Sequence, residues 1–168
     1  MPGSEMRGRA FAMMMGLFLL LAMIILRAEV IRQSPTVGGT APGFHADLIR
    51  GRVLGSRAVT LSKLRGRTVA LLFLRGTGES VVWANWLAAM ERTQPDSFVV
   101  IGILEGRGAF SQSPQAQVVD PGGSLERLYA VTSLPALVWI SPKGTVAARE
   151  RGQASKEALL RDFYTAGQ

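Results

Sequence analysis

The chain has 168 residues, a formal net charge of +7 at neutral pH and no cysteine. One domain of ordinary size with a small appendage fits this length. The lack of cysteine excludes disulfides, thiolate zinc sites, iron–sulfur clusters and cysteine nucleophiles within the chain. Its single histidine, His45, disfavours a histidine-rich metal site and a Ser-His-Asp arrangement. We therefore expect neither a resident metal nor a cofactor.

An uncharged segment near the N-terminus predicts a membrane anchor. The 17 residues from Ala10 to Leu26 carry no charge, and arginines border them on both sides at Arg7, Arg9 and Arg27. A helix of this length spans about 25 Å, which is the short end of a bilayer core. The competing interpretation is a cleaved signal peptide. The apolar run is longer than is usual there, and no small-x-small cleavage site follows it, so an uncleaved anchor is favoured.

The predicted organisation has four parts. They are a tail over residues 1–9, a transmembrane anchor over 10–27, a linker over 28–40 and a folded extracytoplasmic domain over 41–168. The arginines on the two sides of the anchor favour a cytoplasmic N-terminus only slightly. The bilayer is thus an expected partner of residues 10–27.

Strand-like and helix-like patterns alternate after the linker. Continuous apolar runs at 69–74, 98–104 and 136–140 are typical of strands buried on both faces. Helices are expected at 79–92, 125–131 and 156–165, and a returning strand at 145–149 forms a hairpin through the turn that precedes it. This order predicts an α/β domain with a mixed central sheet flanked by helices.

Three separated segments resemble one protein family. The opening Val37–Phe44 (VGGTAPGF), the stretch Val59–Arg67 (VTLSKLRGR) and the stretch Val131–Pro135 before ALVWI occur in the family's order. They are similar to thioredoxin-like proteins of the membrane-anchored, periplasmic type that reduce apocytochromes and other thiols. The resemblance implies a thioredoxin-like fold, a cis-proline at Pro135, and a single-pass protein of the bacterial inner membrane with its C-terminal domain in the periplasm.

The family's Cys-x-x-Cys motif lies where the first central strand turns into its helix. The aligned positions here are Gly78 and Val81, which offer neither a thiolate nor a resolving thiol. The resemblance therefore implies a redox-inactive member with no catalytic residue. Ser80 beside Glu79 superficially suggests a replacement nucleophile, but capping of the helix by Thr77 or Ser80 explains these residues better. We expect no enzyme activity.

Two surfaces are candidates for binding. The first is the docking surface that active relatives use for an extended substrate segment, although Pro135 is equally well explained as an inherited turn. Its expected members are Gly76, Thr77, Glu79, Ser80, Leu134 and Pro135.

The second candidate surface is basic, with no acid between residues 50 and 67. It suits anionic lipid headgroups or an acidic partner, while a solvated arginine-rich surface is the plain alternative. Few aromatic residues lie nearby for base stacking, so nucleic acid is not an expected partner. Its members are Arg50, Arg52, Arg57, Lys63, Arg65 and Arg67.

These features lead to two hypotheses. The first is a non-catalytic accessory subunit that docks on or stabilises a larger integral membrane complex, with a respiratory or photosynthetic electron-transfer assembly as the host suggested by the family. The second is a transient binding module or holder for apocytochrome or other secreted polypeptides.

Overall fold

The computed structural model describes residues 35–75, 78–106, 116–152 and 154–168. The predicted tail, the predicted anchor and the linker up to residue 34 lie outside the described residues. Among the residues that are described, no helix is both long and apolar enough to cross a membrane. The folded unit comprises Pro35–Gln168.

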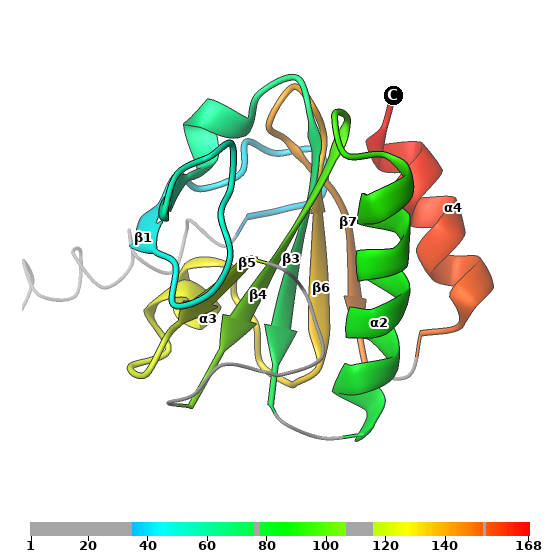
Figure 1. Ribbon diagram of the computed structural model, residues 1–168. Coiled ribbons are helices and arrows are strands. Elements are labelled where there is room, and N and C mark those ends of the chain that lie inside the picture. The colour runs from blue at the N-terminus through cyan, green and yellow to red at the C-terminus, as the bar shows by residue number, and fades with distance from the viewer. Residues whose placement is uncertain (1–34, 76–77, 107–115, 153) are drawn as a thin grey trace, which may run out of the picture. The chain divides into compact units, whose positions relative to one another are not determined.

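A five-stranded mixed sheet forms the centre of the domain, in the order β5-β4-β3-β6-β7 (Figure 1). Within this sheet β3, β4 and β5 run parallel to one another, β6 runs antiparallel beside β3, and β7 runs antiparallel to β6 at the edge. The strands are β3 (Thr68–Leu74), β4 (Phe98–Leu104), β5 (Ala116–Val119), β6 (Ala136–Ile140) and β7 (Val146–Arg151). Because β3, β4 and β6 are buried at every position, the sheet needs cover on both faces.

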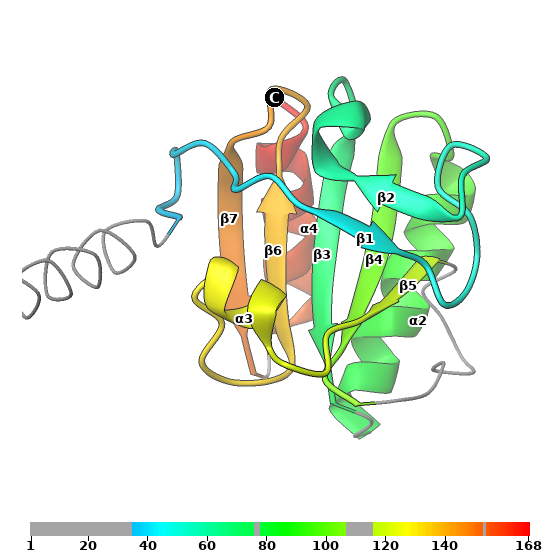
Figure 2. The same cartoon turned by 90° about the vertical axis from the view of Figure 1, so that its left-hand side faces the viewer.

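Different elements cover the two faces of the sheet. Helices α2 (Gly78–Thr93) and α4 (Lys156–Ala166) lie on one face (Figure 1). The opposite face carries the short helix α3 (Ser124–Leu128) and the antiparallel pair β1 (His45–Asp47) and β2 (Ala58–Thr60) (Figure 2). The single-turn 3-10 helix η1 (Leu61–Leu64) then leads into β3.

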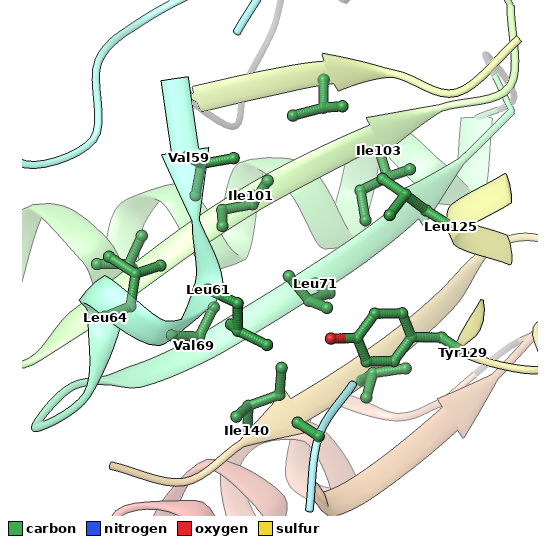
Figure 3. Close-up of a cluster of buried hydrophobic side chains, with 14 of the residues drawn as sticks. Val59, Leu61, Leu64, Val69, Leu71, Ile101, Ile103, Leu125, Tyr129 and Ile140 are labelled. Carbon is green, nitrogen blue, oxygen red and sulfur yellow. The ribbon is translucent and has the colours of Figure 1, made fainter. Parts of the chain in front are cut away.

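Side chains of β3 alternate between two cores. Val69, Leu71 and Phe73 face α3 and β2, where Tyr129 packs among aliphatic side chains (Figure 3). The intervening residues of β3 face α2 and α4. Burial of a large aliphatic or aromatic side chain contributes about 1.5–3 kcal/mol, so β3 stabilises the domain through both layers.

The sequence predictions of the longer elements are confirmed. The predicted strands 98–104 and 136–140 match β4 and β6, and the other predicted elements overlap β3, α2, α3, β7 and α4 with shifted ends. The sequence did not predict β1, β2, η1 or β5. Each of these has only three or four residues, too few to show a clear periodicity.

The residues that open the described chain are bonded to the sheet. Gly38 N–H donates to the Val146 carbonyl at 2.7 Å, and Ala41 N–H donates to the Gly144 carbonyl at 2.9 Å. The Tyr129 hydroxyl donates to the Pro42 carbonyl at 2.6 Å from a fully buried ring. Residues 35–40, the described end of the predicted linker, are thus part of the folded unit.

We predict that Tyr129→Phe lowers the free energy of unfolding by about 1–2 kcal/mol, because it removes the bond to Pro42 and leaves that carbonyl without its donor. Urea unfolding of the full chain in non-ionic detergent, followed by tryptophan fluorescence, measures the change. Tyr164→Phe is the matched control, since Tyr164 is 66% exposed. Equal losses in the two variants would contradict the role of the hydroxyl.

Two carboxyl groups meet where α4 packs on β7. Burial, together with the neighbouring carboxyl group of Asp162, raises the pKa of Glu150 to about 7. The Arg161 guanidinium bonds Asp162 at 3.3 Å and lies 3.9 Å from Glu150. The pair therefore holds a proton near neutral pH that an unfolded Glu150 would release.

This proton links stability to pH. Glu150 binds a proton more tightly in the folded protein than in the unfolded chain. Its contribution to the free energy of unfolding is therefore complete below about pH 4.5 and is lost as the pH rises through about 7. We predict that Glu150→Gln, which carries a permanent donor toward Asp162, removes this loss and is more stable than the wild type by about 2 kcal/mol above that range.

Urea unfolding at about pH 5 and about pH 8 measures this difference. Asp96→Asn removes an exposed carboxyl elsewhere and should keep the wild-type profile. A wild type whose stability does not fall across this interval, or a Gln variant with the same fall, would contradict the shared proton.

Candidate functional site

The carboxyl ends of β3 and β4 form one edge of the sheet together with the start of β6. Leu74 pairs with Leu104 in the parallel register, and Phe73 pairs with Ala136 on the antiparallel side. The peptide bond between Leu134 and Pro135, just before β6, is cis. This edge, which we call the docking edge, therefore brings the cis-proline beside the end of β3, from which α2 follows.

Helix α2 begins at the docking edge. Gly78 is its first residue, and Val81 lies in its first turn and is half-buried. Ser80 is fully buried, and its hydroxyl donates to the Arg75 carbonyl at 3.2 Å. Ser80 therefore presents no side chain to a partner or a substrate. Of the other predicted members, Gly76 and Thr77 lie outside the described residues, as does the side chain of Glu79.

The cis-proline contributes mainly backbone and shape. Pro135 is buried, and its carbonyl accepts a hydrogen bond from Gly152 N–H at 3.0 Å. Leu134 is half-buried and packs against the core beneath α3. Leu134 is therefore the predicted docking residue whose side chain the structure leaves partly accessible.

An ion pair that the sequence analysis did not identify lies at this edge. Arg75 Nε bonds Glu105 Oε2 at 2.7 Å, and a second guanidinium nitrogen bonds Oε1 at 3.2 Å. Arg75 and Glu105 directly follow Leu74 and Leu104, the last register pair of β3 and β4. The sequence alone does not place them side by side, because their meeting depends on how the two strands align. The Arg75 guanidinium lowers the pKa of Glu105. Both side chains are well exposed, so the pair is a polar feature of the surface more than a source of stability.

Two further acidic residues, Asp120 and Glu126, lie at the start of α3 near this ion pair. Asp120 caps α3 by accepting bonds from the Ser124, Leu125 and Glu126 backbone N–H groups at 2.8–3.1 Å. Burial, and repulsion from Glu105 and Asp120, raise the pKa of Glu126. No group of three or more potential metal ligands occurs among the described residues.

The solvent-facing side of α2 is largely apolar, whereas a surface helix ordinarily carries charged or polar residues there. Val82 is 67% exposed, Ala89 is also exposed and Trp86 is half-buried. Asn85 is the one polar residue on this exposed part of the helix, and no charge occurs from residue 80 to residue 90. Trp83, on the opposite side of the helix, is buried in the core. We call the exposed residues Val82, Asn85 and Ala89, with Trp86, the α2 face.

The six residues of the predicted basic surface lie on the hairpin that follows β1, on η1 and on the segment before β3, and two of the hollows that they line share Val53 and Leu54. Arg52 and Arg67 line one hollow, and Lys63 lines another with His45. Arg65 packs its guanidinium against Gly144 and leaves no room for a Cβ there. Arg50 and Arg57 are exposed at the two ends of the hairpin that follows β1.

Comparisons with known proteins place the fold. No protein-family model and no curated protein matches the sequence. A solved structure assigned as the thiol:disulfide interchange protein DsbE from Chlorobium tepidum is 25% identical, with a TM-score of 0.68 over 79% of this chain and 99% of that chain. The domain has the thioredoxin-like fold.

Two further structures agree at the level of the fold. One is assigned as a protein disulfide isomerase from Bacteroides thetaiotaomicron, 21% identical, with a TM-score of 0.64 over 79% of this chain and 90% of that chain. The other is the exposed lipoprotein thioredoxin Etrx1 of Streptococcus pneumoniae, 20% identical, with a TM-score of 0.55 over 73% of this chain and 98% of that chain.

The thioredoxin-like neighbours include thiol-disulfide oxidoreductases, whereas this chain has no cysteine. It therefore has no dithiol to oxidise or reduce. The fold and the cis-proline before β6 are present, while residues other than cysteine occupy the start of α2. The docking edge is thus a surface of backbone, small side chains and one ion pair.

We predict that Gly78→Cys with Val81→Cys forms a reversible intramolecular disulfide, because these positions lie in the first turn of α2, where a helix N-terminus favours a thiolate. Alkylation followed by mass measurement, before and after reduction, detects it. In the control pair Gly78→Cys with Val82→Cys, the second thiol points to solvent and should stay free. Free thiols in the first pair, or a disulfide in both, would contradict the assignment of these positions.

Proposed function

We propose that the chain is a non-catalytic, membrane-anchored accessory subunit whose thioredoxin-like domain docks on a larger integral membrane complex. The proposed host is a respiratory or photosynthetic electron-transfer assembly, by analogy with family relatives that act on apocytochromes. The proposed location is the bacterial inner membrane, with residues 10–27 in the bilayer and the domain on the extracytoplasmic side. The likeness to an exposed lipoprotein thioredoxin supports that side.

The observation that carries the proposal is the α2 face. A helix on the surface of a soluble domain ordinarily has charged or polar residues on its outer side, and a helix that is apolar all round is ordinarily buried. In α2 the side opposite the core carries Val82, Asn85 and Ala89, together with the half-buried Trp86. An exposed apolar patch on a surface helix is typical of a protein interface.

The docking edge supports the same proposal. It retains the cis-proline beside the start of α2, and it lacks sulfur chemistry that would release a bound partner by thiol exchange. The exposed Arg75–Glu105 ion pair provides a polar border. A surface without turnover chemistry suits lasting association better than a catalytic cycle.

We predict that Val82→Glu weakens association of the tagged chain with its complex by at least about a hundredfold, because the interface would then bury an unpaired charge. Purification from mild detergent extracts, followed by size analysis and quantification of co-purifying subunits, measures the association. Val37→Glu is the matched control, since Val37 is 60% exposed and lies outside α2. A wild type that purifies as a free monomer would contradict the proposal.

The alternative function is a transient holder for apocytochrome or other secreted polypeptides. The cis-proline edge favours it, because an extended segment can bind there through backbone groups and small pockets. The two functions differ in stoichiometry. A subunit co-purifies with the same proteins at a fixed ratio, whereas a holder is recovered with varied, incompletely folded chains only after crosslinking.

A further inference from the structure

A strained hairpin turn presents a leucine to solvent. Val53 and Ser56 exchange two backbone hydrogen bonds of 3.0 Å around the central residues Leu54 and Gly55. Both central residues have positive φ, +50° at Leu54 and +79° at Gly55, as a type I′ turn requires. Asn, Asp or Gly is preferred at the first central position, because a side chain such as leucine is strained at positive φ. The leucine side chain is 56% exposed.

Leu54 borders a hollow that contains three arginines. The hollow has a volume of about 360 Å³, and Arg52, Arg67 and Arg92 line it from the hairpin, the start of β3 and the end of α2. Arg92 is distant in sequence from the predicted basic surface, and only the fold brings it to the other two. The hollow lies at the amino ends of β3 and β4, at the opposite end of the sheet from the docking edge.

Two of the three guanidinium groups are held in place. Arg67 donates to the Pro95 carbonyl at 2.9 Å, and Arg52 donates to the Gly55 carbonyl at 3.0 Å. Each bond uses one of the five N–H donors of a guanidinium, so most donors remain for a ligand. Side chains that are already positioned lose less conformational entropy when they bind.

The charge of the lining is positive. Among the described residues that line the hollow, Glu91 is the one acid. Its Oε1 accepts a bond from Val100 N–H at 2.9 Å, and its Oε2 is buried. Three arginines outweigh one buried acid, and they favour an anion whose oxygens accept several N–H bonds, as a phosphate does.

We propose that Leu54 and the three-arginine hollow form a lipid-surface site, in which the arginines bind the phosphodiester of an anionic lipid and Leu54 enters the interfacial layer. The exposed leucine favours a lipid over a soluble phosphate, because a phosphate ion gains nothing from an apolar neighbour, whereas the bilayer interface accepts one. The site would turn the docking edge away from the bilayer. It relies on the proposed function only for the anchor that brings the domain to the membrane.

The test uses the full chain in nanodiscs, either of phosphatidylcholine alone or of equal parts phosphatidylcholine and phosphatidylglycerol. Because the chain has no cysteine, Ser56→Cys carries a single fluorophore next to Leu54, and Ser133→Cys carries one beside the docking edge. Lipids with a nitroxide near the headgroup quench only a fluorophore that touches the membrane. We expect quenching at position 56 but not at position 133, and only with phosphatidylglycerol.

Two sets of variants test the residues. Leu54→Ser, and separately the combined Arg52→Gln, Arg67→Gln and Arg92→Gln, should abolish the quenching. Each lost arginine should lower the ratio of docked to undocked domain about fivefold, and three should lower it about a hundredfold. The charge-matched control combines Arg127→Gln, Arg151→Gln and Lys156→Gln, which lie outside the hollow and should preserve quenching. Tryptophan emission confirms folding of each variant.

Several results would overturn the lipid site. The first is equal quenching in the two lipid mixtures. The second is an equal loss of quenching in the three-arginine variant and in its charge-matched control. The third is quenching at position 133 instead of position 56. Glycerol phosphate in the buffer tests for a soluble ligand. If it binds through the three arginines while nitroxide lipids do not quench position 56, the hollow is a site for a soluble phosphate. Failure of the chain to stay in the nanodisc would contradict the anchor, and a retained chain without quenching would contradict the site alone.

Discussion

Burial of β3 on both faces is the constraint on which the rest of the domain depends. A strand that is apolar at every position must be covered twice, so one layer consists of α2 and α4 and the other of α3 and the β1–β2 pair. The register of β3 with β4 and β6 then fixes what meets at each end of the sheet. The docking edge and the arginine hollow are the two ends of this arrangement.

The docking edge shows how a thioredoxin-like fold persists without its redox chemistry. The two cores consist of aliphatic and aromatic side chains whose burial stabilises the domain without any sulfur–sulfur bond, and the cis peptide bond before β6 is present. Ser80, the remaining hydroxyl described near the start of α2, is buried and bonded to the Arg75 carbonyl. What the surface retains is shape, an ion pair and the α2 face, and these properties suit binding.

Sequence patterns predicted the fold better than the surfaces. The long buried strands and the two long helices have clear periodicity, so they were predicted closely, whereas strands of three or four residues were not. Ion pairs and hollows depend on residues far apart in the chain. Arg75 meets Glu105, and Arg92 joins Arg52 and Arg67, only through strand register and helix packing. A cluster of basic residues in sequence thus lines more than one hollow of the folded domain.

Protection of the α2 face in native membranes tests the central claim most directly. Because the chain has no cysteine, Val82→Cys introduces a single thiol whose reaction with a membrane-impermeant maleimide can be timed in native membranes and after purification in detergent. A docked subunit predicts slow labelling in the membranes and fast labelling once purified, with Val37→Cys fast in both. Equally fast labelling of Val82→Cys in both preparations would contradict docking through α2.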